Sequence, residues 1–255
     1  MKTISEVFQL VDCEVCGNTR SVMYVDPILG NRVKSCICIG YRRNLAQLKH
    51  SQIPKVYLGQ SFSDYKPELG EDKSVWRANK KSCKAICDTV ARHSIVVEEG
   101  IDTLIYGDKG SGKTMLACIM LKELILQHGY TGIFVTAEEL IAIAVESTKY
   151  GGDKTMQLND LIDLDFVVVD NFHKAVALDD MRINDTVRIL LDNFFSKRKN
   201  LGKCFILTSS VSMEHLLKKK RFIIAMAYTI IRHTLQGCYA KEARRNKISK
   251  LHLGD

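Results

Sequence analysis

The chain has 255 residues, a formal net charge of +8 and a hydrophobic content of 46%, which suits a protein with one sizeable core. No apolar run approaches the ~20 residues of a membrane span, and the first residues lack an apolar signal core. We therefore expect a cytoplasmic protein without membrane contacts. Its nine cysteines are then expected to be thiols or metal ligands rather than disulfides. The positive charge permits binding to a polyanion.

The N-terminal part of the chain carries two closely spaced cysteine pairs. Two residues separate Cys13 from Cys16, and one residue separates Cys36 from Cys38. Two such pairs around a short hairpin-like insert are typical of a structural zinc site with four thiolate ligands. The segment has too few apolar residues for its own core, so zinc would supply its folding free energy. The tight second pair leaves His50 as an alternative fourth ligand.

Composition divides the chain into three regions. Residues 1–52 form the expected zinc-binding module, and residues 53–73, with two of the three prolines, form an expected linker. Residues 74–255 alternate helical patterns with short apolar strands, which predicts an α/β fold with a parallel sheet flanked by helices. We expect the elements of this third region in the following order: helix 75–92, strand 101–106, helix 113–128, strand 131–136, helix 137–150, strand 166–170, helix 183–198, strand 204–208, helix 213–220 and helix 222–235.

The segment between strand 101–106 and helix 113–128 fits the phosphate-binding pattern G-x-x-x-x-G-K-[ST] at every fixed position. Its glycines let the backbone approach phosphate oxygens, and its amides face an anion at the start of the helix. We expect Lys113 to reach the β- and γ-phosphates and Thr114 to bind Mg²⁺. The nucleotide-binding residues predicted on this basis are Gly107, Asp108, Lys109, Gly110, Ser111, Gly112, Lys113 and Thr114.

A second part of the same site is predicted at the end of strand 166–170. Four apolar residues precede Asp170, as in a central parallel strand that is covered on both faces. Ligands of α/β sheets bind at the carboxyl ends of the strands, where Asp170 lies. We therefore assign Asp170 to the Mg²⁺ site together with Thr114.

Several segments together resemble the DnaC/DnaI-type replicative helicase loaders, above all their phage and mobile-element versions, and the IstB-type ATPases share the core. The segments are 53–65, 106–114, 166–170 and 207–214. The resemblance implies a P-loop AAA+ fold with a small C-terminal helical lid, ATP or ADP with Mg²⁺, and self-assembly through the AAA+ domain. It also implies that the N-terminal module contacts a hexameric replicative helicase and that the ATPase domain contacts single-stranded DNA during DNA replication.

The chain departs from the family pattern at the catalytic positions, for which we predict Lys113, Asp170, Asn171 and Ser210. Asn171 stands where the family has an acid, and an amide cannot accept a proton from water. Ser210 stands where the family has a sensor asparagine. We therefore expect ATP binding with slow hydrolysis. Four arginines are candidates for a finger or sensor role, none with a clean match: Arg221, Arg232, Arg244 and Arg245.

Two basic clusters, 218–221 and 244–250, are candidates for salt-sensitive contacts to DNA phosphates, or for solvated surface. The leading interpretation is a loader of a replicative helicase. The alternatives are an IstB-like transposition helper and a weakly hydrolysing, nucleotide-dependent adaptor or inhibitor of a replication protein. The zinc module favours the loader, whereas Asn171 and Ser210 favour the adaptor. A small-molecule kinase ranks last because no acceptor site is recognisable.

Overall fold

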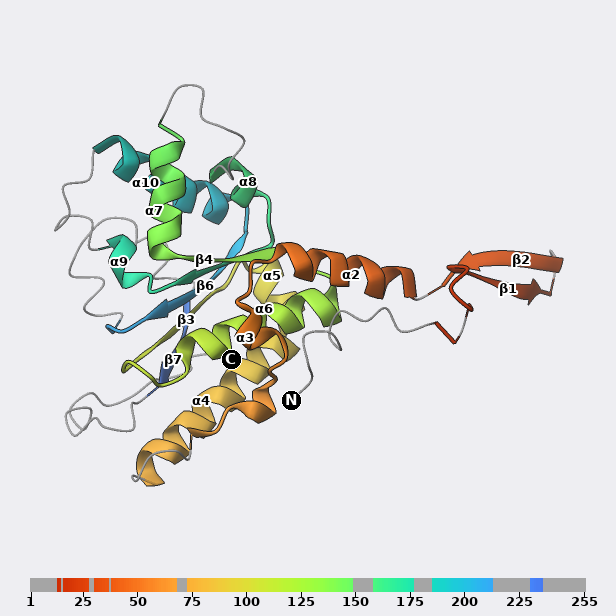
Figure 1. The fold of residues 1–255 in the computed structure, drawn as a ribbon, viewed down its shortest axis with the longest axis horizontal. Coiled ribbons are helices and arrows are strands. Elements are labelled where there is room, and N and C mark those ends of the chain that lie inside the picture. The colour runs from red at the N-terminus through yellow and green to blue at the C-terminus, as the bar shows by residue number, and fades with distance from the viewer. Residues whose placement is uncertain are drawn as a thin grey trace.

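The computed structural model describes residues 13–14, 16–27, 30–36, 38–67, 73–148, 158–176, 185–212 and 230–235. An antiparallel hairpin of β1 (Ser21–Asp26) and β2 (Gly30–Ser35) lies at the end of an arm that continues into helix α2 (Cys38–His50). Figure 1 shows this arm projecting from an α/β body. Within the described residues, no helix combines the length and the apolar character needed to cross a membrane.

The body is built on a five-stranded sheet with the strand order β4-β5-β6-β3-β7, in which all neighbours are parallel. Its strands are β3 (Asp102–Gly107), β4 (Gly132–Thr136), β5 (Phe166–Asp170), β6 (Cys204–Ser209) and β7 (Ile230–Leu235). Because all strands run the same way, their carboxyl ends meet at one edge. Strand β6 separates β3 from β5 there, so the two strands that lead to the predicted site are not neighbours.

Helices cover both faces of this sheet (Figure 1). The helices of the body are α3 (Lys55–Leu58), the 3₁₀ turn η1 (Phe62–Asp64), α4 (Lys73–Ala91), α5 (His93–Glu98), α6 (Lys113–His128), α7 (Ala137–Glu146), α8 (Leu158–Ile162), α9 (His173–Val176) and α10 (Asp185–Asn200). In β5, Val167 and Val169 pack with α7, α8 and α10, whereas Phe166 and Val168 pack with α4, α5 and α6. This alternation explains why the strand is apolar throughout.

The fold class expected from the sequence, an α/β P-loop protein with a parallel sheet between helices, is confirmed. One element is wrong: residues 230–235, expected in an apolar helix over 222–235, form strand β7 beside β3. A short apolar run does not distinguish strand from helix by periodicity, and Ile230, Ile231 and Thr234 are β-branched. The expected helix 213–220 and the remainder of the lid lie outside the described residues.

Residues 53–65, the first part of the expected linker 53–73, lie directly on the body. Ile53 and Leu58 are buried in the cluster around α6. Lys122 of α6 is itself buried, and its ammonium group donates hydrogen bonds to the carbonyl groups of Gln60 and, over 3.5 Å, of Leu58. A buried ammonium group needs such acceptors, so this contact fixes the segment to α6. The boundaries of the three predicted regions stay a prediction.

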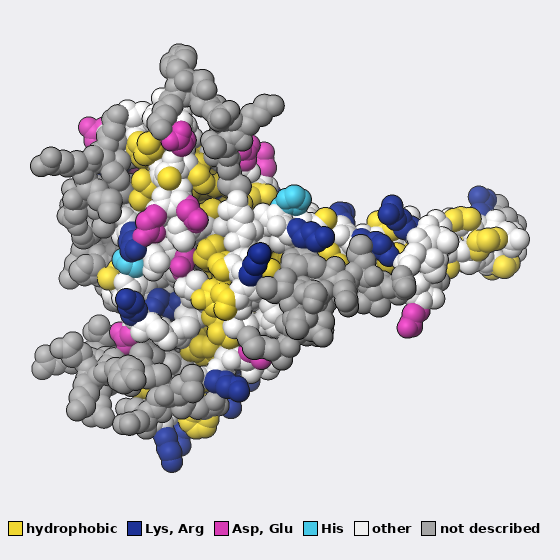
Figure 2. Space-filling model, in the orientation of Figure 1, with side chains coloured by type: hydrophobic (Ala, Val, Ile, Leu, Met, Phe, Trp, Pro, Cys, Tyr) yellow, Lys and Arg dark blue, Asp and Glu magenta, His cyan; other side chains and the backbone are white. Residues whose placement is uncertain are grey.

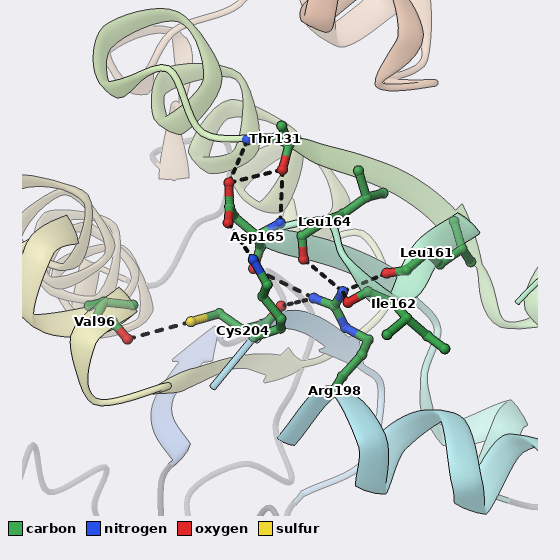
Figure 3. Close-up of polar contacts among 9 residues, drawn as sticks. Val96, Thr131, Leu161, Ile162, Leu164, Asp165, Arg198 and Cys204 are labelled. Atoms are coloured by element: carbon green, nitrogen blue, oxygen red, sulfur yellow. Dashed lines mark hydrogen bonds and ion pairs between the residues drawn. The ribbon is translucent and has the colours of Figure 1, made fainter. Parts of the chain in front are cut away.

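Arg198 of α10 joins the amino-terminal ends of β5 and β6, opposite the predicted site (Figure 3). The side chain is fully buried, and its guanidinium group lies 4.8 Å from the ring centre of Phe205. Burial lowers its pKa to about 10, so the group stays charged at neutral pH. It donates hydrogen bonds to five backbone carbonyl groups, those of Leu161, Ile162, Leu164, Asp165 and Cys204.

A second polar contact holds the same end of the sheet (Figure 3). Asp165, just before β5, accepts hydrogen bonds from the backbone and the hydroxyl group of Thr131, both over 2.9 Å. Its other oxygen accepts from Lys203, just before β6, over 2.8 Å. The starts of three neighbouring strands, β4, β5 and β6, are therefore fixed to one carboxylate.

We predict that Arg198→Met lowers the free energy of unfolding by about 3–5 kcal/mol, because the carbonyl groups around it would remain buried without donors. Lys197→Met on the same helix is the matched control, since Lys197 is exposed, and its effect should stay within about 0.5 kcal/mol. Urea unfolding of both variants measures the difference. Equal stabilities for the two variants would contradict the role assigned to Arg198.

Candidate functional site

The phosphate-loop segment connects β3 to α6 with a backbone that only glycine adopts readily. Gly110 and Gly112 have φ angles of 81° and 87°, and α6 begins at the next residue, Lys113. The first amides of α6 consequently face the space above the carboxyl edge of the sheet. This is the geometry in which a helix start and a glycine-rich loop together attract an anion.

Two side chains of this loop have polar groups suited to a phosphate. The Lys113 ammonium group donates to the backbone carbonyl of Asp108 over 2.6 Å, and burial lowers the pKa of Lys113. The Ser111 hydroxyl group is buried and has no hydrogen-bond partner among the described residues. A lysine folded back on its own loop and an unpaired buried hydroxyl group both fit a site that binds an anionic ligand.

Asp170 lies beside the start of α6, although β6 separates their strands. Its Oδ1 accepts a hydrogen bond from the Thr114 hydroxyl group over 2.9 Å and another from the Thr208 hydroxyl group. Its Oδ2 accepts from the Asn171 side-chain amide over 3.3 Å. The Thr114 hydroxyl group and the Asp170 carboxylate are hard oxygen ligands and could together hold Mg²⁺.

The other two predicted catalytic residues lie at the same edge but face different partners. Asn171 has a φ of 56°, and its backbone N–H donates to the Thr208 hydroxyl group over 2.9 Å, so its side chain is fixed beside Asp170. Ser210 directly follows β6 and contacts His173, with 3.0 Å between Ser210 Oγ and His173 Nε2. Of the candidate arginines, Arg232 lies in β7 opposite Leu104, and Arg221, Arg244 and Arg245 lie outside the described residues.

Sequence reasoning missed two residues at the site, His173 and Tyr65. The Tyr65 hydroxyl group donates to the carbonyl of Ser111 over 3.0 Å, and its ring covers Gly112 so closely that a Cβ there would lie 2.6 Å from Tyr65 Cε2. Tyr65 belongs to segment 53–65, which resembles the helicase loaders, but this resemblance assigns no role to Tyr65. His173 follows Asp170 by three residues, and no local pattern distinguishes it.

The structure brings the four predicted zinc ligands together at the base of the hairpin. Their sulfur atoms all lie within 4.8 Å of one another, with 3.6 Å between Cys13 and Cys36 and between Cys16 and Cys38. A tetrahedral zinc with Zn–S bonds of ~2.3 Å places its sulfurs about 3.8 Å apart, so the cluster could hold this metal. His50 ends the helix that Cys38 begins, about 18 Å away along the axis.

The pKa values of the cysteines in this cluster also favour the binding of a cation. Burial and hydrogen bonds from neighbouring thiols raise the pKa of Cys38 to about 12. Burial also acts on Cys16, but hydrogen bonds from Cys13 and from the backbone outweigh it and lower the pKa of Cys16 to about 6. Four thiolates in so small a volume repel one another, and a divalent cation would remove that conflict.

We predict that Gly112→Ala lowers the free energy of unfolding by about 1–3 kcal/mol more than Gly110→Ala does. Both positions have a positive φ, but a Cβ at Gly110 meets nothing within 4 Å, whereas at Gly112 it collides with Tyr65. In a Tyr65→Ala background the two alanine variants should become equal. Urea unfolding of these variants measures the effect of the collision. A stability difference between Gly110→Ala and Gly112→Ala that persists in the Tyr65→Ala background would contradict this explanation.

The comparisons with known proteins agree with this geometry. The family profile described as "IstB-like ATP binding protein" matches residues 79–233. No curated protein matches the chain. A crystal structure of the DnaC helicase loader is 21% identical, with a TM-score of 0.56 over 71% of this chain and 99% of that chain.

Two further solved structures share the fold at similarly low identity. DnaI is 19% identical, with a TM-score of 0.51 over 73% of this chain and 93% of that chain. The replication initiator DnaA, bound to AMPPCP and single-stranded DNA, is 18% identical, with a TM-score of 0.52 over 72% of this chain and 50% of that chain. Because the family profile covers more than half of the residues, the chain belongs to the IstB-like ATP-binding protein family.

Proposed function

We propose that this protein binds Mg²⁺-ATP and loads a hexameric replicative helicase onto single-stranded DNA during DNA replication. The contact between Thr114 and Asp170, beside Lys113, carries the proposal, because it combines a phosphate loop with a carboxylate suited to the metal. Lys113 would neutralise phosphate charge, and Thr114 and Asp170 would hold the metal, which supplies further charge neutralisation when bound. The fold shared with the DnaC loader supports helicase loading as the process in which this protein acts.

The arm supports a protein partner. Met23, Val25 and Val33 alternate onto one face of the hairpin and are 71%, 74% and 65% exposed. Figure 2 shows apolar side chains gathered at this end of the molecule. An exposed apolar cluster of this kind is typical of interaction sites, and we assign this hairpin face to the helicase. The four cysteines at its base would bind zinc and stabilise it.

The remaining contacts follow from the same proposal. The ATPase domain would contact single-stranded DNA through phosphates, and copies of the chain would assemble through this domain. Both basic clusters that the sequence offers for DNA, 218–221 and 244–250, lie outside the described residues. DnaA, which shares the fold, was solved with single-stranded DNA, and this supports the assignment.

Two other functions have an observation in their favour. A transposition helper is favoured by the match to the IstB-like family. A weakly hydrolysing adaptor is favoured by Asn171, because its amide donates to Asp170 and offers no group that accepts a proton from water. Turnover measured with and without single-stranded DNA separates the adaptor from the loader, since an adaptor should hydrolyse ATP in neither case.

We predict that Lys113→Ala weakens the binding of Mg²⁺-ATP at least tenfold, because a buried charge-assisted contact to phosphate is lost. Lys109→Ala is the matched control in the same loop, because the Lys109 side chain is exposed and only its backbone is expected to contact the ligand. Titration calorimetry on the full chain measures both. Absence of binding in the unaltered protein would refute the nucleotide site.

We predict one zinc ion per chain in the purified protein and its loss in Cys36→Ser, because three thiolates and a hydroxyl group bind zinc poorly. Cys87→Ser is the control, since Cys87 lies on α4 outside the cluster. Elemental analysis gives the metal content, and a chelator should lower the melting temperature of the unaltered protein and of Cys87→Ser but not that of Cys36→Ser. A zinc-free protein with an intact arm would contradict the assignment.

We predict that Val25→Asp abolishes capture of a hexameric replicative helicase and leaves the dissociation constant for Mg²⁺-ATP unchanged, because the hairpin is remote from the phosphate loop. Lys34→Asp is the control on the opposite face of the same hairpin, where Tyr24 and Arg32 also lie. Co-purification with each variant reports capture. Retention of the helicase by Val25→Asp would refute this surface, and capture of a transposase instead would favour the alternative function.

A further inference from the structure

The hairpin of the arm has a second face, opposite the apolar cluster, that the proposed function leaves unassigned. The pairing of β1 with β2 sets Tyr24 opposite Arg32 and Val22 opposite Lys34. Because side chains alternate along a strand, these four residues share one face of the ribbon. Arg32 and Lys34 are exposed, and Tyr24 is 41% exposed. This cationic face, formed by Tyr24, Arg32 and Lys34, is therefore open to a partner.

Within the cationic face, an aromatic ring lies between two positively charged side chains. The Lys34 ammonium group lies 5.3 Å from the centre of the Tyr24 ring, which is the distance of a cation–π contact. Arg32 is the direct cross-strand partner of Tyr24, and such partners have their Cβ atoms about 5 Å apart. This arrangement matches a nucleotide, which carries a negative phosphate group next to a flat base.

Hydrogen bonds at the base of the hairpin hold this face in place. The guanidinium group of Arg42, on α2, donates to Asn18 Oδ1 over 2.7 Å, and the backbone N–H of Cys13 donates to the same oxygen over 3.0 Å. The backbone N–H of Cys36 donates to the carbonyl of Arg20 over 2.9 Å. The base is thus fastened to α2, and a ligand would find the ring and the two cations already in position, which lowers the ordering cost of binding.

The charge of the arm favours a polyanion as the partner of this face. In its described residues, 13–14, 16–27, 30–36 and 38–50, six residues are Lys or Arg and two are acidic. A zinc ion held by four thiolates would offset only part of this positive excess. The acidic residue on the hairpin itself, Asp26, is half-buried at the tip, beyond Tyr24. Figure 2 shows Lys and Arg side chains at several points along the arm.

The exposed ring of Tyr24 selects among the possible polyanions. In a duplex the bases are stacked on one another, so a duplex would contact the two cations and leave the ring unused. An acidic peptide supplies negative charge but no base to cover the ring. An unpaired base can stack on an exposed aromatic side chain while the adjoining phosphates meet cations. A single strand therefore uses all three residues of the cationic face.

We propose that the cationic face of the hairpin binds single-stranded DNA, with one base stacked on the Tyr24 ring and neighbouring phosphates at Arg32 and Lys34. The apolar face stays available to the helicase, so one hairpin holds the strand and the helicase together. The choice of DNA over RNA rests on the proposed function. The contact itself does not depend on nucleotide, because the hairpin lies at the outer end of the arm (Figure 1).

Fluorescence anisotropy of the full chain with labelled oligo(dT) tests this contact. Tyr24→Ala should weaken binding about tenfold, with and without Mg²⁺-ATP, whereas Tyr24→Phe should bind normally because the ring remains. Arg32→Gln should reduce the slope of the logarithm of the binding constant against the logarithm of the salt concentration by about 0.7, the value for one lost phosphate contact on a single strand. Asn31→Ala is the matched control, since Asn31 pairs with Val25 on the apolar face, and should change neither quantity.

The possible results separate this inference from the proposed function. Unchanged affinity of Tyr24→Ala for oligo(dT), or an equal loss of affinity for a duplex, overturns the stacking contact, and helicase capture by the same variant shows that its arm is intact. Failure of the unaltered protein to bind Mg²⁺-ATP or a helicase refutes the loader and leaves the DNA measurement valid. If Tyr24→Ala loses its metal, photocrosslinking of oligo(dT) carrying 5-iododeoxyuridine to the unaltered protein decides. A crosslink at Tyr24 supports the inference, and crosslinks confined to other residues overturn it.

Discussion

The hydrogen bond between Thr114 and Asp170 is the contact on which the site depends. Strand β6 lies between β3 and β5, so no backbone hydrogen bond joins the strand before the phosphate loop to the strand that ends at Asp170. Side chains have to span that gap, and Thr208 of β6 donates to the same carboxylate from between them. The start of α6, through Thr114, and strand β6, through Thr208, are consequently both held by one carboxylate at the carboxyl edge of the sheet.

The two ends of the sheet use their polar residues for different purposes. At the amino-terminal end, the charged groups contact other parts of the protein: both terminal nitrogens of Arg198 donate to carbonyl groups, and Asp102, the buried first residue of β3, accepts from Lys199 over 3.2 Å. Burial raises the pKa of Asp102 to about 6. At the carboxyl end, the Ser111 hydroxyl group is left without a protein partner. The contacts at the amino-terminal end fix the sheet, whereas the unpaired Ser111 hydroxyl group lies in the loop that is proposed to bind phosphate.

The sequence predicts the parts of the site that depend on local patterns. The phosphate loop and strand 166–170 are predictable because glycine spacing and an apolar run ending in an acid are visible within a few residues. Strand β7 is not predictable from such patterns, because its conformation depends on pairing with β3, more than a hundred residues earlier in the chain. Tyr65 and His173 were not singled out because their roles arise only when the fold brings them to Gly112 and Ser210.

Helix α6 connects the nucleotide site to the arm through contacts of unequal strength. Its first residue, Lys113, belongs to the phosphate loop, and near its end the Leu126 carbonyl accepts from Asn44 of α2 over 3.1 Å. Between them, buried Lys122 holds the carbonyl of Gln60. Lys122 also lies 3.7 Å from Glu123, so losing the carbonyl contacts would leave a buried charge only partly compensated. These contacts tie the segment from Ile53 to Tyr65 to the helix that begins at the phosphate loop, and a movement of α6 would carry the segment with it.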